Sequence, residues 1–172
     1  MMKTTYCMMI ALAVAAVGCT RAAEDGKAAD SGKPVAVAEK ATKMSKSVPK
    51  GWIEDFAAAK AQAAKENKKI LMAFSGSDWC PWCVKMEKDV YSQRDFIDKA
   101  SKDFVLVMID NPQDRSILSS LAATQNEALA RQYGISGFPS TLVLDANGKV
   151  LESFSGYHAG GPESMLKAIS GK

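Results

Sequence analysis

Short apolar runs alternate with stretches of helical periodicity along the chain after residue 50. Four runs have the length and composition of buried strands, and they cover residues 70–74, 104–109, 141–144 and 150–154. Apolar side chains recur at helical spacing over residues 52–67, 80–90 and 117–133, and Pro162 opens a last helix that ends near Ile169. Because a strand, a helix and another strand follow one another, the pattern favours an α/β fold with helices on both faces of a central sheet.

Local signals predict where several of these elements begin and end. The first helix would carry one apolar stripe formed by Trp52, Phe56, Ala59 and Ala63. Residues 92–95 have the spacing of a capping box and predict a further short helix. Gly134 is the stop signal for the helix over 117–133. Turn residues at 145–148, between two apolar runs, predict a β-hairpin.

Composition divides the chain into three segments. Of the 13 aromatic residues, 12 follow Gly51, which places the hydrophobic core in residues 51–172. Residues 20–50 contain no aromatic residue and carry seven basic against four acidic side chains. Such a segment buries too little apolar surface to offset the entropy of ordering it, so residues 19–50 are predicted to be a flexible tether.

The first residues are typical of an export signal. Lys3 precedes an uncharged apolar run over residues 6–17, which is too short to span a bilayer and predicts a signal peptide over 1–18. Ala16-Val17-Gly18-Cys19 resembles the lipobox of bacterial lipoproteins, and this resemblance implies that Cys19 becomes the lipidated first residue of the mature chain. The alternative is an ordinary secretory leader cut near Ala22 or Ala23. Both interpretations predict export to the periplasm or cell envelope, and the first adds a lipid anchor to a membrane.

Charge and cysteine content exclude several functions. The net charge of +3 is small and arises outside residues 51–172, which hold 14 basic and 15 acidic residues, so nothing indicates nucleic-acid binding. Four cysteines are too few for a disulfide-rich scaffold. A structural zinc site needs four ligands, whereas the domain offers Cys80, Cys83 and His158, so no metal is expected.

The segment Trp79-Cys80-Pro81-Trp82-Cys83 carries the chemistry. The first cysteine follows a buried strand and opens a helix, where unpaired backbone N–H groups favour its thiolate. The second cysteine lies three residues on, within disulfide reach, and can release a substrate held as a mixed disulfide. We therefore expect Cys80 to be the nucleophile and Cys83 the resolving thiol, with Trp79 and Trp82 providing apolar surface around the reactive sulfur.

Together with Gly137-Phe138-Pro139 about fifty residues later, the motif that starts at Asp78 resembles the thioredoxin superfamily. It is most similar to exported bacterial thioredoxin-like proteins that carry Phe-Ser-Gly-Ser-Asp-Trp-Cys, here residues 74–80. The resemblance implies a thioredoxin-like fold with a central mixed sheet over 51–172. It also implies a cis peptide bond before Pro139, and a Phe138 backbone that pairs with an extended substrate.

The sequence departs from the thioredoxin pattern at three places. Phe74 stands where thioredoxins commonly carry a buried Asp that accepts the proton of the resolving thiol. Asp78 or Glu87 could take over this proton transfer, or both could be solvated surface charges. The stretch over 112–126 is longer than its thioredoxin counterpart, and it could add a wall that faces the substrate or add nothing. Pro-Trp replaces Gly-Pro between the two cysteines.

These observations predict an exported thiol–disulfide oxidoreductase that needs no cofactor. Its partners would be proteins with disulfides or dithiols, including an envelope protein that donates or accepts electrons. The family resemblance favours reduction over oxidation of substrates. The alternative is a non-catalytic binding module that holds an envelope partner along the Pro139 edge.

Overall fold

A four-stranded mixed sheet forms the centre of the domain in the computed structural model, which describes residues 44–171. The strands are β1 (Lys69–Ser75), β2 (Phe104–Asp110), β3 (Ser140–Leu144) and β4 (Val150–Ser155). Their spatial order is β2-β1-β3-β4, with β1 parallel to β2 and antiparallel to β3, and with β3 and β4 paired as a hairpin. All four predicted strands are therefore present.

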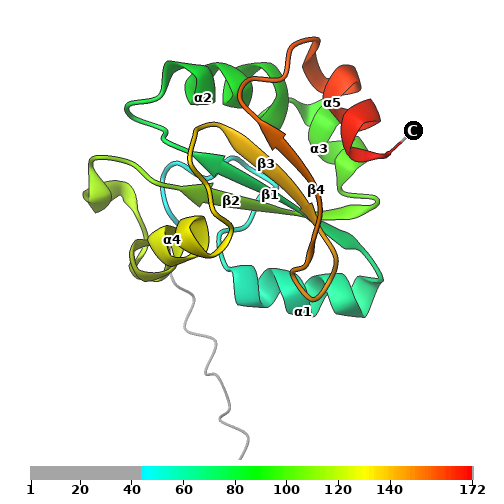
Figure 1. The fold of residues 1–172 in the computed structure, drawn as a ribbon, viewed down its shortest axis with the longest axis horizontal. Helices are drawn as coiled ribbons and strands as arrows, with labels where there is room; N and C mark the ends of the chain where they lie inside the picture. The colour runs from blue at the N-terminus through cyan, green and yellow to red at the C-terminus, as the bar shows by residue number, and fades with distance from the viewer. Residues whose placement is uncertain (1–43, 172) are drawn as a thin grey trace, which may run out of the picture. The chain divides into compact units, whose positions relative to one another are not determined.

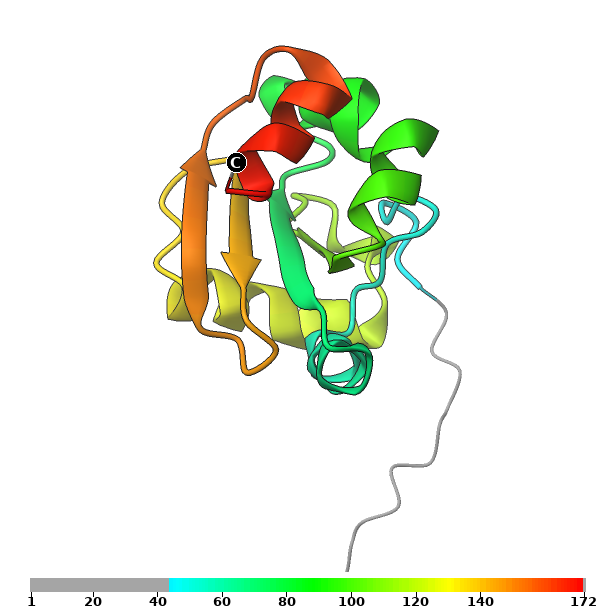
Figure 2. The same cartoon turned by 90° about the vertical axis from the view of Figure 1, so that its right-hand side faces the viewer.

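Helices cover both faces of this sheet, as Figures 1 and 2 show. One face carries α1 (Phe56–Glu66) and α4 (Ser120–Gln132). The other face carries α2 (Pro81–Met86), α3 (Arg94–Ala100) and α5 (Gly161–Ile169). A π-helical turn, η1 (Glu87–Tyr91), continues α2, and a 3-10 turn, η2 (Arg115–Ile117), precedes α4. The predicted α/β arrangement is confirmed.

The two helical layers explain why the inner strands are buried: β3 is buried throughout, and β1 is buried everywhere except at Lys69. Alternate residues of a strand point to opposite faces, so a strand covered on both sides buries every side chain. Leu71 and Ala73 pack in the core between the sheet and α2, α3 and α5. Ile70 and Met72 pack in the core between the sheet and α1 and α4. β4 lies at the edge of the sheet, and its side chains are exposed or half-buried.

Trp52 does not share the stripe that its spacing predicts. The first helix begins at Phe56 because the Asp55 carboxylate accepts a hydrogen bond from the Ala58 N–H at 2.9 Å and caps it. Trp52 lies before this cap and packs on the opposite face of the sheet, where its indole Nε1 donates to the Tyr91 carbonyl at 2.9 Å. The predicted start of this helix was therefore wrong, because spacing alone does not show where a cap interrupts the helix.

Two other helix starts differ from the prediction. α3 follows Gln93, which makes no side-chain capping bond, and the Ser92 hydroxyl instead donates to Glu87 Oε1 at 3.5 Å. The short helix is present, but the capping box was wrong. α4 begins at Ser120 because the Ser119 hydroxyl accepts from the Ala122 N–H at 3.0 Å.

The packed part of the chain begins before Gly51. Ser45 is buried, and its N–H donates to Glu54 Oε2 at 3.0 Å. The Lys46 N–H donates to the Ile117 carbonyl at 3.1 Å. Residues 44–50 therefore pack on the domain, although their composition assigns them to the tether. The predicted signal peptide, Cys19 and the tether up to residue 43 lie outside the described residues.

Ile53 adds one residue of pairing to the outer edge of β2. Its N–H donates to the Leu106 carbonyl at 3.0 Å, and its carbonyl accepts from the Met108 N–H at 2.9 Å, which forms a parallel bridge to Val107. The chain that enters the domain thus covers the middle of this edge. Within residues 44–171 no helix is both long enough and apolar enough to cross a membrane.

Candidate redox-active site

Cys80 and Cys83 form a disulfide at the start of α2, with their Cα atoms 5.2 Å apart. β1 ends at Ser75, and a short loop leads to Cys80, which is the N-cap residue of the helix. Pro81 occupies the first turn, where a missing N–H costs little. The Cys80 sulfur accepts a hydrogen bond from the Cys83 N–H at 3.2 Å. The predicted position of the pair, between a buried strand and a helix, is confirmed.

The two sulfurs have different surroundings. Cys80 is 5% exposed and Cys83 only 1%, so a reactant from solvent reaches Cys80 more easily. The Cys83 N–H in the first turn of the helix donates to the Cys80 sulfur, and the partial positive charge of this helix end favours a thiolate there. These two properties suit Cys80 to act as the nucleophile and Cys83 to act as the resolving thiol.

Asp78 is tied into the neighbouring loop. Its carboxylate oxygens accept from the Gln113 N–H at 2.9 Å and the Asp114 N–H at 2.8 Å. The Asp114 bond, followed by the Gln113 bond, holds the pKa of Asp78 below its usual value. Asp78 therefore links the loop before Cys80 to the loop after β2, and it is a weak proton acceptor.

Glu87 lies one helical turn after Cys83, and its backbone N–H donates to the Cys83 carbonyl. Its side chain is half-buried. Burial raises the pKa of Glu87, and the negative charge of Asp110 raises it further. A carboxylate with a raised pKa, on the helical face of Cys83, is suited to accept a proton.

Asp110 is a buried acidic residue that the sequence analysis did not select. It ends β2, and its side chain accepts from the Ser77 N–H at 2.9 Å and from the Ser77 hydroxyl at 2.6 Å. These bonds fix the loop that precedes Cys80. The signal in the sequence was a single acid at the end of an otherwise apolar strand, where a buried carboxylate needs partners.

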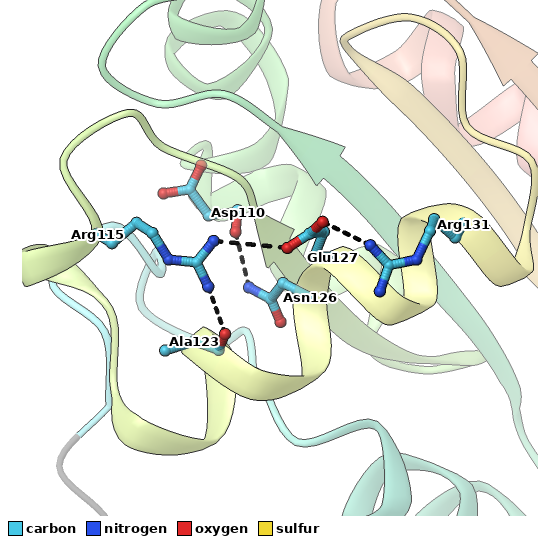
Figure 3. A network of polar contacts seen from close by, with 6 residues as sticks. All are labelled: Asp110, Arg115, Ala123, Asn126, Glu127 and Arg131. Carbon is cyan, nitrogen blue, oxygen red and sulfur yellow. Dashed lines mark hydrogen bonds and ion pairs between the residues drawn. The ribbon is translucent and has the colours of Figure 1, made fainter.

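The stretch over 112–126 forms η2 and the first half of α4, and polar contacts hold it together (Figure 3). Arg115 donates to the Ala123 carbonyl and pairs with Glu127. Asn126 is buried, and its Nδ2 donates to the Asp110 carbonyl at 2.7 Å. The stretch therefore secures the end of β2.

Phe138 and Pro139 lie against the disulfide-bearing loop. Their peptide bond is cis, as the family resemblance implied. Pro139 is buried and Phe138 half-buried, and the Trp79 ring meets the Phe138 ring edge-on at 5.5 Å. Within residues 44–171 no hydrogen bond uses the Phe138 backbone, which leaves its N–H and C=O free for a partner strand.

Beside them lies an open groove of about 330 Å³, lined by Trp82, Phe138, Pro139, Gly156 and Tyr157. Trp82 is 58% exposed, and its ring centroid lies 5.6 Å from that of Tyr157. No residue of the 112–126 stretch lines this groove. The structure therefore brings Trp82, Phe138 and Pro139 together, and it adds Tyr157, which the sequence analysis did not select.

Two further residues from the sequence analysis do not line this groove. Phe74 is buried in the core between the sheet and α1 and α4. Its ring meets the Tyr133 ring edge-on, with the two centroids 6.4 Å apart. His158 contacts the Ser164 hydroxyl through Nε2 at 3.0 Å. Within the described part of the chain, no group of three or more His, Cys, Asp or Glu residues is placed to hold a metal ion.

A mixed sheet between two helical layers, with a disulfide at a helix start after β1 and a cis-proline just before the neighbouring strand β3, defines a thioredoxin-type fold and site. A family model described as a thioredoxin-like domain matches residues 56–170. The disulfide bond reductase DsbH of Chlamydia pneumoniae is 31% identical over 116 residues, which are 67% of this chain and 69% of DsbH. The thioredoxin-related protein DsbJ of the same organism is 29% identical over 93 residues, 54% of this chain and 26% of DsbJ.

A solved DsbH oxidoreductase structure aligns with a TM-score of 0.64 and 26% identity over 86% of this chain and 93% of that one. The chain therefore belongs to the thioredoxin-like family, and it is homologous to DsbH and DsbJ. The predicted thioredoxin-like fold is confirmed. The Cys80–Cys83 disulfide fits a redox-active site for thiol–disulfide exchange.

Proposed function

We propose that this protein is an exported thiol–disulfide oxidoreductase that reduces disulfides in other proteins. The observation that carries the proposal is the Cys80–Cys83 disulfide at the start of α2, after a loop whose Trp79 packs on Phe138, the residue before the cis-proline Pro139. The name of the relative DsbH, a disulfide bond reductase, supports the reducing direction.

Reduction would proceed in two exchanges between sulfur atoms. The Cys80 thiolate attacks one sulfur of the substrate disulfide, which forms a mixed disulfide and releases the first substrate thiolate. The Cys83 thiolate then attacks the Cys80 sulfur, which releases the second substrate thiolate and leaves the Cys80–Cys83 disulfide. The substrate has gained two electrons and two protons, and a partner dithiol protein restores both to the enzyme. No cofactor takes part.

The second exchange requires Cys83 to lose its proton, and we assign Glu87 as the acceptor. Its raised pKa and its place one turn after Cys83 support this role. Asp78 is the weaker candidate because two backbone N–H groups already occupy its oxygens. Phe74 offers no acidic group to share the task.

The substrate would bind as an extended segment along Phe138, whose free backbone groups can pair with it as a sheet edge does. Trp79, Trp82 and Pro139 would provide the apolar surface around the attacked sulfur. Trp79 is 41% exposed and Trp82 is 58% exposed, so both rings are accessible to a substrate.

The leader over 1–18 supports export, and the lipobox-like sequence before Cys19 supports anchoring to an envelope membrane. In this arrangement the residues after Cys19 would hold the domain near the membrane without restricting its orientation. Radioactive palmitate should label the intact chain, and it should not label Cys19→Ala. Labelling of the variant would refute the anchor at this residue.

Trapping tests the catalytic roles. Cys83→Ser should accumulate stable mixed disulfides through Cys80, which mass spectrometry of the trapped proteins would identify. Cys80→Ser should abolish insulin reduction by the otherwise identical protein. If Cys80→Ser kept full function with its partner while the unmodified protein failed to reduce insulin, the protein would be a binding module.

The redox potential tests the direction. Equilibration of the Cys80–Cys83 pair with glutathione should give a potential in the range of reductants such as thioredoxin, about −270 mV. A value near the −120 mV scale of a strong oxidant would refute the reductase assignment.

A further inference from the structure

The groove that Trp82 forms with Phe138 and Pro139 is built from aromatic and small uncharged residues. Trp82 and Tyr157 contribute two neighbouring aromatic rings, and Phe138 and Pro139 also line the groove. Gly156 is also part of the lining, and its missing side chain leaves open space above it, because a Cβ there would meet nothing within 4 Å. Among the residues that the structure describes, the groove lining therefore offers aromatic rings but no charged side chain.

The ion pair between Lys85 and Asp89 holds the Tyr157 side chain in place. Its hydroxyl donates to Asp89 Oδ2 at 2.7 Å, and Lys85 Nζ approaches the same oxygen at 2.6 Å. The Lys85 ammonium also lies 5.0 Å from the centroid of the Tyr157 ring. The bond from Lys85, followed by that from Tyr157, keeps the pKa of Asp89 below its usual value. Tyr157 thus presents a fixed ring to the groove.

Strand geometry predicts which substrate side chain reaches this groove. In an extended segment, residues two apart point to the same side. If a substrate pairs with the Phe138 backbone and directs its cystine sulfur at Cys80, the side chain two positions from that cysteine also faces the protein. Phe138 itself lines the groove, and so does Trp82, two residues after Cys80. A side chain of a segment that pairs with Phe138 would therefore lie next to the groove.

We infer that this groove selects disulfides with an aromatic side chain two positions from the attacked cysteine, an inference that rests on the proposed function. Tyr157 is the specificity-determining residue of the groove. An aromatic side chain can pack against Trp82 and Tyr157 at the spacing that the two rings already show. One such contact corresponds to a preference of about threefold to tenfold in rate.

Single-turnover kinetics tests this inference. The full-length protein is reduced, freed of reductant and mixed with disulfide-linked dimers of a Ser/Gly peptide that differ only in Phe or Ala two positions before the cysteine. A second pair of dimers carries the change two positions after the cysteine. Released peptide thiol is measured after acid quenching. We expect the Phe peptide of at least one pair to react about threefold to tenfold faster than its Ala counterpart.

Tyr157→Ala should bring this rate ratio close to one, and Trp82→Ala, at a largely exposed position, should lower it as well. Val84→Ala is the matched control: Val84 is apolar, 50% exposed and on α2, but it does not line the groove, so the ratio should persist. A ratio of one in the unmodified protein, or an unchanged ratio in both groove variants, would overturn the inference. Failure to reduce any peptide or glutathione disulfide would overturn the proposed function and this inference with it.

Discussion

Replacing Gly76 by Ala should displace Trp79 from its place beside the active site. A Cβ at position 76 would lie 2.6 Å from the Trp79 indole nitrogen, which is far inside contact distance. Because Trp79 is 41% exposed, its ring can swing toward solvent instead of distorting the core. The ring would then lose its hydrogen bond to the Asn111 carbonyl, 2.8 Å long, and its edge-on contact with Phe138.

The expected destabilisation follows from these two losses. The hydrogen bond contributes about 1 kcal/mol net, and the aromatic contact contributes about 0.5–1.5 kcal/mol. Alanine restricts the unfolded chain more than glycine does, which stabilises the folded state. This effect offsets about 0.4–1 kcal/mol of the loss. Gly76→Ala should therefore lower the free energy of unfolding by about 1 kcal/mol.

Gly137→Ala is the matched control, because its backbone is not in the left-handed region and a Cβ there would meet nothing within 4 Å. This variant should gain about 0.4–1 kcal/mol from the unfolded state alone. Urea unfolding of the two oxidised variants should give midpoints that differ by roughly 1 M. The Trp79 indole N–H resonance should shift only in Gly76→Ala. Equal midpoints together with an unmoved resonance would refute the reasoning.

Three further variants test buried polar groups in the oxidised protein. Tyr91→Phe removes the partner of the buried Thr141 hydroxyl, 2.6 Å away, and should lower the free energy of unfolding in urea by about 1–2 kcal/mol. Burial raises the pKa of Tyr91 to about 12, so this loss should be the same at pH 7 and pH 9. Ser77→Ala removes a donor to the Asp110 carboxylate and should cost about 1.5–3 kcal/mol at pH 7; a loss below 0.5 kcal/mol would contradict the role given to this bond. Glu87 has a raised folded-state pKa, so between its unfolded and folded values the native state binds more protons and stability falls as pH rises. Glu87→Gln should therefore gain stability relative to the unmodified protein from pH 4 to pH 8, and an equal difference at both pH values would contradict the raised pKa.

Features encoded in adjacent residues could be predicted from the sequence. The disulfide pair follows from two cysteines three positions apart at a strand-to-helix junction, which fixes their separation whatever the rest of the chain does. The buried strands follow from continuous apolar runs, because a strand covered on both faces needs apolar side chains at every position. The β-hairpin over 145–148 follows for the same local reason, since its turn residues determine the chain reversal.

Features that depend on distant partners could not be predicted. Trp52 has the spacing of a helical stripe, but the Asp55 cap and the Tyr91 carbonyl place it on the opposite face. Tyr157 and Asp89 are 68 residues apart and show no periodicity that would connect them. Asp110 appears in the sequence as an ordinary strand end, and only the fold brings Ser77 to it. Each of these residues is defined by a contact that forms only when the sheet is assembled.

The bridge between Ile53 and β2 has a consequence for self-association. β2 is buried along its whole length and rich in β-branched residues, and an uncovered strand of this kind is a template for pairing with another chain. Ile53 occupies the middle of its outer edge, whereas no strand of residues 44–171 pairs with the outer edge of β4. A chain shortened to begin after Ile53 would lose the buried Trp52 as well, although the residues of the disulfide, the groove and every strand would remain. It would nevertheless expose the β2 edge, and we expect it to aggregate where the longer chain stays dispersed.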